Sequence, residues 1–186
     1  MGETCQGSHM RAITEPRENV PVVRAWQPFE VFYRDELPGV LALCLAVSRR
    51  PWVAEELAQE AFLKAYRGWD KVGGYERPDA WVRRVALNLA ASWGRRVQAE
   101  TRALLRAELR PANLPTGAPP DDEFWEAVRS LPRRQAQTLA LYYVEDRPVE
   151  EIATVLGIEP GTARVHLTRG RRNLATRLGL KGGESE

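Results

Sequence analysis

Hydrophobic residues recur along most of this chain at the spacing of an amphipathic helix. Between positions 54 and 65 they fall at i, i+3, i+4, i+7, i+8 and i+11, which makes one apolar stripe. That stripe consists of Ala54, Leu57, Ala58, Ala61, Phe62 and Ala65. Convincing strand alternation is absent, and so are the Asn-Gly and Asp-Gly pairs typical of hairpins. The pattern predicts an all-α fold.

Proline divides this helical pattern into two blocks. Helical spacing runs from Pro28 to about Val97, and residues 99–109 could start another helix. A run containing Pro111, Pro115, Gly117, Pro119 and Pro120 follows, and such a run cannot continue a helix. We therefore expect two small helical domains joined by a Pro-rich linker. The expected divisions are a flexible segment 1–26, a first domain 27–97, a linker 98–120, a second domain 121–178 and a frayed tail 179–186. Residues 7–10 read Gly-Ser-His-Met, which looks like a cloning scar, so residues 1–10 carry no functional inference.

The residue inventory argues against several classes of function. Two cysteines, Cys5 and Cys44, cannot build a disulfide framework, and Cys44 in an apolar run is expected to be buried and inert. The two histidines have no neighbours with metal-ligand spacing, so no metal or other cofactor is expected. We find no phosphate-binding loop and no nucleophile–base pair, so an enzyme is not expected. No apolar run approaches the ~20 residues that span a bilayer, and no secretory signal precedes the first block. These absences predict a cytoplasmic protein that does not insert into membranes.

The first block carries two polar surfaces. The face opposite the 54–65 stripe is mostly charged, and pattern alone favours a solvated surface there. The expected helix 79–97 has a core stripe of Val82, Val85, Ala86, Leu89 and Trp93. Its second stripe combines aromatic, amide and arginine side chains: Trp81, Arg84, Asn88, Ala91 and Arg95. Such a face suits a nucleic-acid strand, because arginine pairs with phosphate and aromatic rings stack on bases. An ordinary solvated face with a core Trp fits the pattern about as well.

The second block has the spacing of a helix-turn-helix. Pro148 stands at the start of a short helix, Gly157 is placed for a left-handed cap, and Pro160 starts the next helix. The inward positions of that last helix are Ala163, Leu167, Gly170 and Leu174. The net charge is only +2, but residues 161–181 hold six Lys or Arg and no acid, whereas residues 121–159 are rich in acid. A basic helix after a tight turn predicts binding in a DNA groove.

Several stretches together resemble the sigma-70 family of bacterial transcription initiation factors. Residues 54–65 (AEELAQEAFLKA) resemble the polymerase-binding signature of sigma domain 2, and residues 80–90 (AWVRRVALNLA) resemble its promoter-melting helix. Residues 131–135 resemble the entry to sigma domain 4, and residues 151–157, 161–164 and 169–171 resemble its helix-turn-helix. The matches occur in the family's order, and the lack of other domains points to the small extracytoplasmic-function (ECF) group.

The resemblance implies partners and residue roles. The partners would be core RNA polymerase, promoter DNA and an anti-sigma factor. The polymerase would be bound through Glu55, Glu56, Gln59, Glu60 and Leu63. The −10 element would be met by a base-receiving loop 72–77 that includes Tyr75, and by Trp81, Arg84, Asn88 and Arg95. The −35 bases would face Arg164, Val165, Thr168 and Arg169, while Thr162, His166, Arg171 and Arg172 would hold phosphates. The linker would thread toward the channels of the polymerase.

Some positions depart from the family, and two other functions stay open. Val165 stands where relatives often carry serine, and His166 where they often carry arginine, so the −35 sequence cannot be inferred. Glu159 takes the N-cap position, where serine or aspartate caps better. One alternative is a stand-alone helix-turn-helix regulator that uses only residues 121–178, which leaves the first block unexplained. The other is a helical protein-interaction adaptor. A structure with Arg164 and Arg169 buried would contradict the sigma interpretation.

Overall fold

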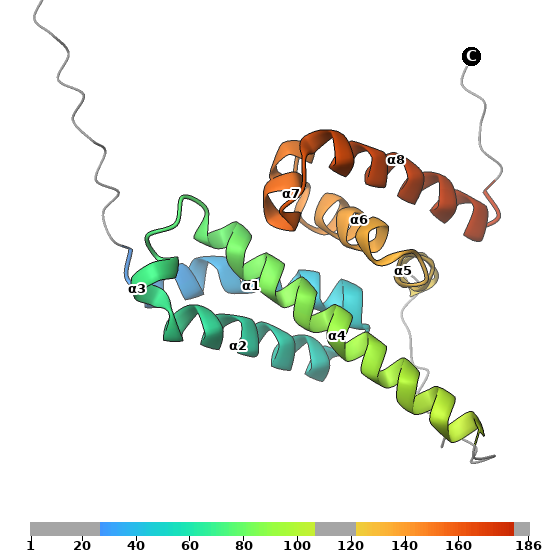
Figure 1. The fold of residues 1–186 in the computed structure, drawn as a ribbon, viewed down its shortest axis with the longest axis horizontal. Helices are drawn as coiled ribbons and strands as arrows, with labels where there is room; N and C mark the ends of the chain where they lie inside the picture. Colours follow the sequence, from blue (N-terminus) through green and yellow to red (C-terminus); the bar gives the residue numbers. More distant parts are fainter. Residues whose placement is uncertain (1–26, 107–121, 181–186) are drawn as a thin grey trace, which may run out of the picture.

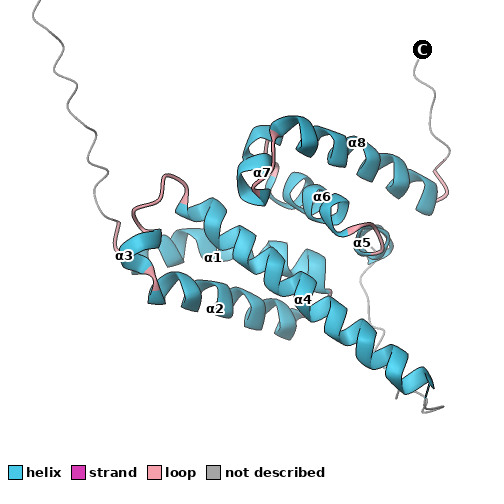
Figure 2. Cartoon of the chain, in the orientation of Figure 1, coloured by secondary structure: helices cyan, strands magenta, loops and turns pink. Residues whose placement is uncertain are grey.

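The computed structural model describes residues 27–106 and 122–180. Within those ranges the chain forms eight helices and no strand, as expected for an all-α protein (Figures 1 and 2). The expected leading segment, most of the expected linker, and residues 181–186 of the tail lie outside these ranges. So do Cys5 and His9.

Helices α1 (Phe29–Ser48), α2 (Pro51–Arg67), α3 (Trp69–Val72) and α4 (Pro78–Arg106) form an N-terminal bundle. All six residues of the predicted stripe on α2 are buried, which confirms it. Phe32, Phe62 and Trp69 fill the centre of the bundle, with ring centroids of Phe32 and Trp69 4.8 Å apart. The chain leaves α1 through Arg49, which has a φ of 68° and donates its backbone N–H to the Leu45 carbonyl at 2.9 Å.

Helix α4 is longer than the sequence pattern predicted. The helix expected for residues 79–97 continues unbroken to Arg106, so residues 99–106 of the separate helix expected for 99–109 belong to α4, and residues 107–109 lie outside the described ranges. The reason is composition: Gln, Ala, Glu, Arg and Leu dominate positions 98–106, and the first proline comes only at Pro111. In Figure 1 the last turns of α4 project beyond the rest of the bundle.

Helices α5 (Asp122–Arg129), α6 (Arg133–Glu145), α7 (Val149–Leu156) and α8 (Pro160–Arg177) form a C-terminal unit. Gly157 has a φ of 63° and ends α7 in the left-handed conformation that was predicted for it. The four predicted inward residues of α8 are all buried, and Glu159 is its N-cap without a capping side-chain bond. The spacing of Ala136, Leu139, Ala140 and Tyr143 at i, i+3, i+4 and i+7 also predicts that Tyr143 faces inward, and that prediction was wrong. Tyr143 is 45% exposed and meets the ring of Phe124 edge to face, with centroids 5.4 Å apart.

The N-terminal bundle and the C-terminal unit pack directly against each other. One buried cluster draws Leu43, Ala80 and Leu87 from the bundle and Ala140, Leu141 and Ile152 from the unit. Helix α1 lies against α6 and α4 lies against α7. The two units therefore share a continuous apolar core.

Candidate functional site

Helix α8 presents the cationic surface expected of a recognition helix. Arg164, Val165, Thr168, Arg169 and Arg172 are all exposed along its outer side, as is Thr162 at its start. The inner side lies close to α6, because a Cβ on Gly170 would stand only 3.2 Å from Leu139. Arg164 makes an ion pair with Glu150 of α7 at 3.2 Å, with both side chains 63% exposed. A pair so exposed is weak and can yield to a phosphate.

His166 and Arg171 lie on the two flanks of α8. Partial burial and the charges of Arg134 and Arg169 lower the pKa of His166. The imidazole therefore lies in a positive environment that favours an anion. Arg171 stacks over the ring of Tyr142, with its guanidinium carbon 4.4 Å from the ring centroid. This contact gives Arg171 a partner within the C-terminal unit, which the sequence reasoning did not anticipate.

The second candidate surface runs along α4 and the loop that precedes it. Trp81 and Tyr75 are half-buried and pack against the core of the bundle. Together with Arg84 they line a cavity of about 360 Å³, to which the C-terminal unit contributes Thr154. Arg95 lies further along α4, exposed, and donates a hydrogen bond to Ser92 at 3.0 Å.

Two of these α4 side chains are engaged by the C-terminal unit. Arg84 donates hydrogen bonds to the backbone carbonyls of Val155 at 2.7 Å and Thr154 at 2.6 Å. Asn88 accepts a hydrogen bond from Arg133 through its side-chain oxygen. The structure thus brings Tyr75, Trp81, Arg84 and Asn88 to one side of α4, but the C-terminal unit covers part of that side.

The third candidate surface is the charged side of α2. Glu55, Glu56, Gln59 and Leu63 are exposed and Glu60 is half-buried. A hydrogen bond from Lys64, whose nitrogen lies 2.8 Å from the carboxylate, together with the Lys64 charge, lowers the pKa of Glu60.

Beside this surface lies an apolar cavity of about 690 Å³ that sequence reasoning missed. Gln59 and Leu63 line it together with Tyr33 and Leu37 of α1 and Tyr66 of α2. The available signal was the spacing of Phe29, Tyr33 and Leu37 at i, i+4 and i+8.

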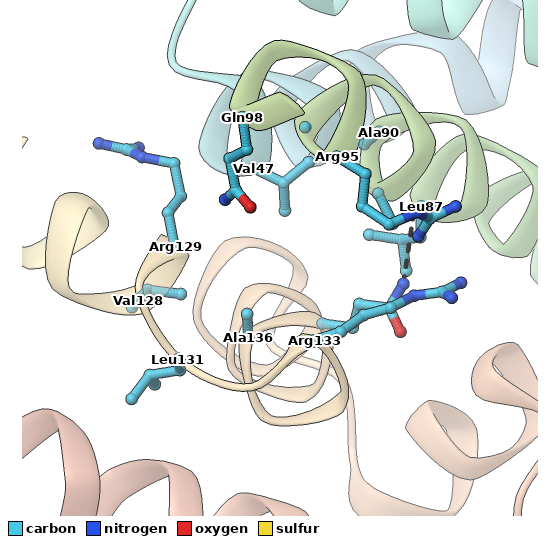
Figure 3. A pocket seen from close by; sticks show the side chains of 13 residues that line it. Val47, Leu87, Ala90, Arg95, Gln98, Val128, Arg129, Leu131, Arg133 and Ala136 are labelled. Carbon is cyan, nitrogen blue, oxygen red and sulfur yellow. Dashed lines mark hydrogen bonds between the residues drawn. The ribbon is translucent and has the colours of Figure 1, made fainter. Parts of the chain in front are cut away.

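A further cavity of about 370 Å³ lies between the N-terminal bundle and the C-terminal unit (Figure 3). Its apolar wall includes Val47, Leu87 and Val128, and arginines stand at its edge. Burial and the charges of Arg134 and Arg95 lower the pKa of Arg133 there.

Residues 27–106 and 122–180 contain neither a metal-binding cluster nor a membrane-spanning helix. No group of three His, Cys, Asp or Glu side chains in these ranges could hold a metal ion. None of the helices there combines the length and apolar character needed to cross a bilayer. Cys44 is buried as expected, and burial raises the pKa of its thiol to about 12.

Comparison with known families assigns both units. Residues 32–100 match the family model described as sigma-70 region 2, and residues 121–174 match the one described as sigma-70, region 4. This chain belongs to the sigma-70 family. The two regions follow each other in the order expected from the sequence motifs, and its relatives include members of the ECF group.

The relatives of this sigma factor are distant but extensive. It is 27% identical over 158 residues to the RNA polymerase sigma-E factor of Streptomyces avermitilis, covering 81% of this chain and 84% of that one. It is 25% identical over 161 residues to the ECF RNA polymerase sigma factor SigW of Bacillus subtilis, with coverage of 78% and 84%. A Xanthomonas campestris protein named "Probable RNA polymerase sigma factor RfaY" is 28% identical over 152 residues, and this chain spans only 37% of its length.

Solved structures share the fold of this sigma factor. The sigma factor RpoE of Bartonella quintana, crystallised with the anti-sigma factor NepR, superposes with a TM-score of 0.58 at 20% identity, covering 83% of this chain and 98% of that one. CnrH in complex with the cytosolic domain of CnrY gives a TM-score of 0.59 at 17% identity, with coverage of 83% and 89%.

Proposed function

We propose that this sigma factor binds core RNA polymerase and directs it to promoters by recognising a −10 and a −35 element. The observation that carries the proposal is the joint presence of regions 2 and 4 with an exposed, basic helix-turn-helix. A stand-alone helix-turn-helix regulator would need only the C-terminal unit and would leave the match over residues 32–100 without a role. The role is to position polymerase and DNA, without a catalytic step, in the cytoplasm.

Recognition of the −35 element is assigned to α8. Arg164, Val165, Thr168 and Arg169 would face base edges in the major groove, since they share its exposed side. Thr162, His166 and Arg172 would contact phosphates from the flanks and the outer side. Arg171 would first have to leave Tyr142, so we assign it a smaller share of phosphate binding.

Recognition of the −10 element is assigned to α4 and the loop before it. The cavity beside Tyr75 and Trp81 would receive an unstacked base, because an aromatic wall and a nearby guanidinium suit stacking and hydrogen bonding. Arg84, Asn88 and Arg95 would follow the strand along α4.

Docking on polymerase is assigned to the exposed side of α2 and the neighbouring apolar cavity. Glu55, Glu56 and Glu60 supply charge, while Gln59 and Leu63 also reach into the cavity. An apolar pocket edged by polar groups is the usual anatomy of a protein-binding surface. By analogy with the Bartonella quintana complex, we further propose that an anti-sigma factor binds this chain.

Reconstituted transcription tests the function. Core polymerase would be incubated with fragmented genomic DNA, with and without the chain, and transcript starts would be mapped. We expect starts that depend on the chain and share two upstream sequence elements. Transcripts that are the same with and without the chain would contradict the proposal.

Polymerase docking has its own test. The double variant Glu56→Ala with Gln59→Ala should bind core polymerase roughly tenfold more weakly, a loss of about 1.4 kcal/mol, because we place these two residues among the few that contribute most of the binding energy of an interface. Binding would be followed by biolayer interferometry, with circular dichroism to verify folding. Glu123→Ala, an exposed site on α5, is the matched control and should bind normally. If the double variant and the control bind polymerase equally well, the α2 surface is an ordinary solvated surface and does not contact polymerase.

A further inference from the structure

The N-terminal bundle and the C-terminal unit are joined by a buried charge network as well as by apolar contacts. Arg83 of α4 is only 5% exposed and donates hydrogen bonds to both carboxylate oxygens of Glu145, at 2.7 and 2.9 Å. It also donates to Glu36 of α1 at 2.6 Å. The Glu145 side chain is 7% exposed and comes from the end of α6. A buried acid from one unit is therefore neutralised by a buried arginine of the other.

The network continues toward α7. Arg147 donates to Glu145 at 2.9 Å and to Glu151 at 2.6 Å, and it reaches Asp79 of α4 at 3.5 Å. Arg77 bridges the same two acids, Asp79 and Glu151, at 2.9 and 3.2 Å. Burial opposes ionisation of Asp79, but the bond from Arg77 and the three nearby arginine charges hold its pKa below the ordinary value. Cationic and anionic side chains thus alternate across the junction, by which we mean the contact between the N-terminal bundle and the C-terminal unit.

Helix α1 carries a glycine, Gly39, where it passes this network. A Cβ at Gly39 would lie 2.8 Å from a carboxylate oxygen of Glu145 and 3.0 Å from a guanidinium nitrogen of Arg83. Glycine within a helix is unfavourable compared with alanine, so its presence here has a packing reason. A side chain at position 39 would therefore have to displace the Glu145 carboxylate or the Arg83 guanidinium from its present position.

The junction holds one of the proposed −10 residues against the C-terminal unit. The two carbonyl oxygens that Arg84 binds lie in the last turn of α7, where a helix carries partial negative charge. They offer the guanidinium the same kind of acceptor as the phosphate oxygens of a DNA strand. Arg84 cannot make these bonds and hold a strand in the same place.

We propose that the Arg83–Glu145–Arg147 network is an intramolecular latch that keeps the end of α7 on Arg84 and so masks the −10 surface. Opening the latch frees Arg84 and Asn88 for the DNA strand, so that strand binding and latch closure compete. This inference rests on the proposed function, because it takes α4 as the −10 surface.

Two independent variants weaken the latch without touching the proposed −10 residues. Glu145→Gln removes the charge that faces Arg83, while Arg83 keeps Glu36 and Arg147 keeps Glu151. Gly39→Leu places a side chain where the Glu145–Arg83 pair sits, and it favours helix α1 locally. Glu123→Gln is the matched control, since it also neutralises one acid of the C-terminal unit but at an exposed site.

Opening would be measured by energy transfer between two dyes. Glu100→Cys on α4 and Ser130→Cys just after α5 are exposed sites, one on the N-terminal bundle and one on the C-terminal unit. Cys5→Ser removes the second native thiol, and Cys44 should resist labelling because it is buried and burial raises the pKa of its thiol to about 12. We expect transfer to fall in both latch variants and to stay unchanged in the control. If energy transfer is unchanged in both latch variants, the network does not hold the two units together and the latch proposal is wrong.

Strand affinity is the second measurement, made with unlabelled proteins. The probe is a single-stranded oligonucleotide carrying the −10 sequence found by start mapping. Both latch variants should bind it roughly fivefold or more tightly than the unmodified chain, since a masked state lowers apparent affinity. If the latch variants open but bind the oligonucleotide no more tightly than the unmodified chain, the C-terminal unit does not mask the −10 surface. If the chain directs no transcription at all, the proposed function fails, while the energy-transfer result still decides whether the junction is a latch.

Discussion

The two surfaces proposed to bind DNA, on α8 and on α4, both carry arginines, but the arginines of α8 are exposed while Arg84 of α4 is bonded to the C-terminal unit. On α8, Arg164 pairs with the exposed carboxylate of Glu150, and Arg169 and Arg172 are exposed. On α4, Arg84 is held by two backbone carbonyls of the neighbouring unit, and Asn88 is bonded to Arg133. An arginine-rich stripe therefore does not by itself define an available binding surface. Its availability depends on which other element can supply acceptors to it.

The two surfaces also differ in the free-energy cost that DNA binding has to overcome. On the base-facing side of α8, a duplex has to displace the exposed Arg164–Glu150 ion pair, worth about 0–1 kcal/mol. A strand that approaches α4 has to displace a packed unit that buries Leu43, Leu141 and Ile152. We therefore expect −35 binding to be close to its intrinsic strength, and −10 binding to be the regulated step.

The apolar part of the junction should give the largest effect. Leu43 of α1 is fully buried among residues of α6 and α7, so Leu43→Ala should lower the free energy of unfolding by about 2–5 kcal/mol. Urea denaturation followed by circular dichroism measures it. Leu45→Ala is the control, because Leu45 lies two residues further along the same helix but is 43% exposed, and it should change stability by less than about 0.5 kcal/mol. A loss for Leu43→Ala as small as the one predicted for Leu45→Ala would show that the junction adds little stability and would remove the contrast between the two surfaces.

Arg169→Ala should give an intermediate effect on the open surface. If Arg169 reads a guanine, the variant should weaken −35 duplex binding by about 1–3 kcal/mol and lose discrimination at one position. Arg172→Ala should instead weaken binding about equally on all sequences and reduce its dependence on salt. Fluorescence anisotropy with a set of single-base variants distinguishes the two. Identical profiles for both variants would assign Arg169 to phosphate contact.

His166 should give the smallest effect, a dependence of −35 binding on pH. Burial and two arginines lower its pKa in the free chain, and a phosphate next to it would raise the pKa again. Binding would then take up a proton, so affinity should rise by a few tenths of a kcal/mol as pH falls from about 7.5 to 6. In the free chain the sign is opposite: a lowered folded pKa means that stability falls as pH drops below 6.5. His166→Gln should remove both dependences, and a pH response that persists in the variant would exclude His166 as a phosphate contact.

The sequence predicted those features that depend on local spacing. The stripe on α2, the glycine that ends α7 and the four inward residues of α8 each follow from helical periodicity within a few turns. The exposed side of α8 follows from the same spacing, because what is not turned inward faces solvent.

Features that depend on distant partners could not be predicted in this way. Arg83 and Glu145 are 62 positions apart, and each looks like an ordinary surface charge in its own helix. Arg171 was predicted to contact a phosphate, yet its guanidinium stacks over the ring of Tyr142. The docking of the C-terminal unit on α4 decides both the burial of Arg83 and the occupation of Arg84, and no periodic pattern encodes that docking.

The end of α7 has a consequence for how the two promoter elements communicate. Its last carbonyls accept bonds from Arg84 of one unit and from Arg134 of the other, whose nitrogen lies 3.3 Å from the Leu156 oxygen. Eight residues are too few for a helix to persist unaided, so these side chains brace the first helix of the helix-turn-helix. If melted DNA binds Arg84 as proposed, α7 loses one of these bonds, and the amides of Gly157 and Ile158 should exchange their hydrogens faster. By reciprocity, DNA that rigidifies α7 from the upstream side should alter how readily the downstream strand is captured.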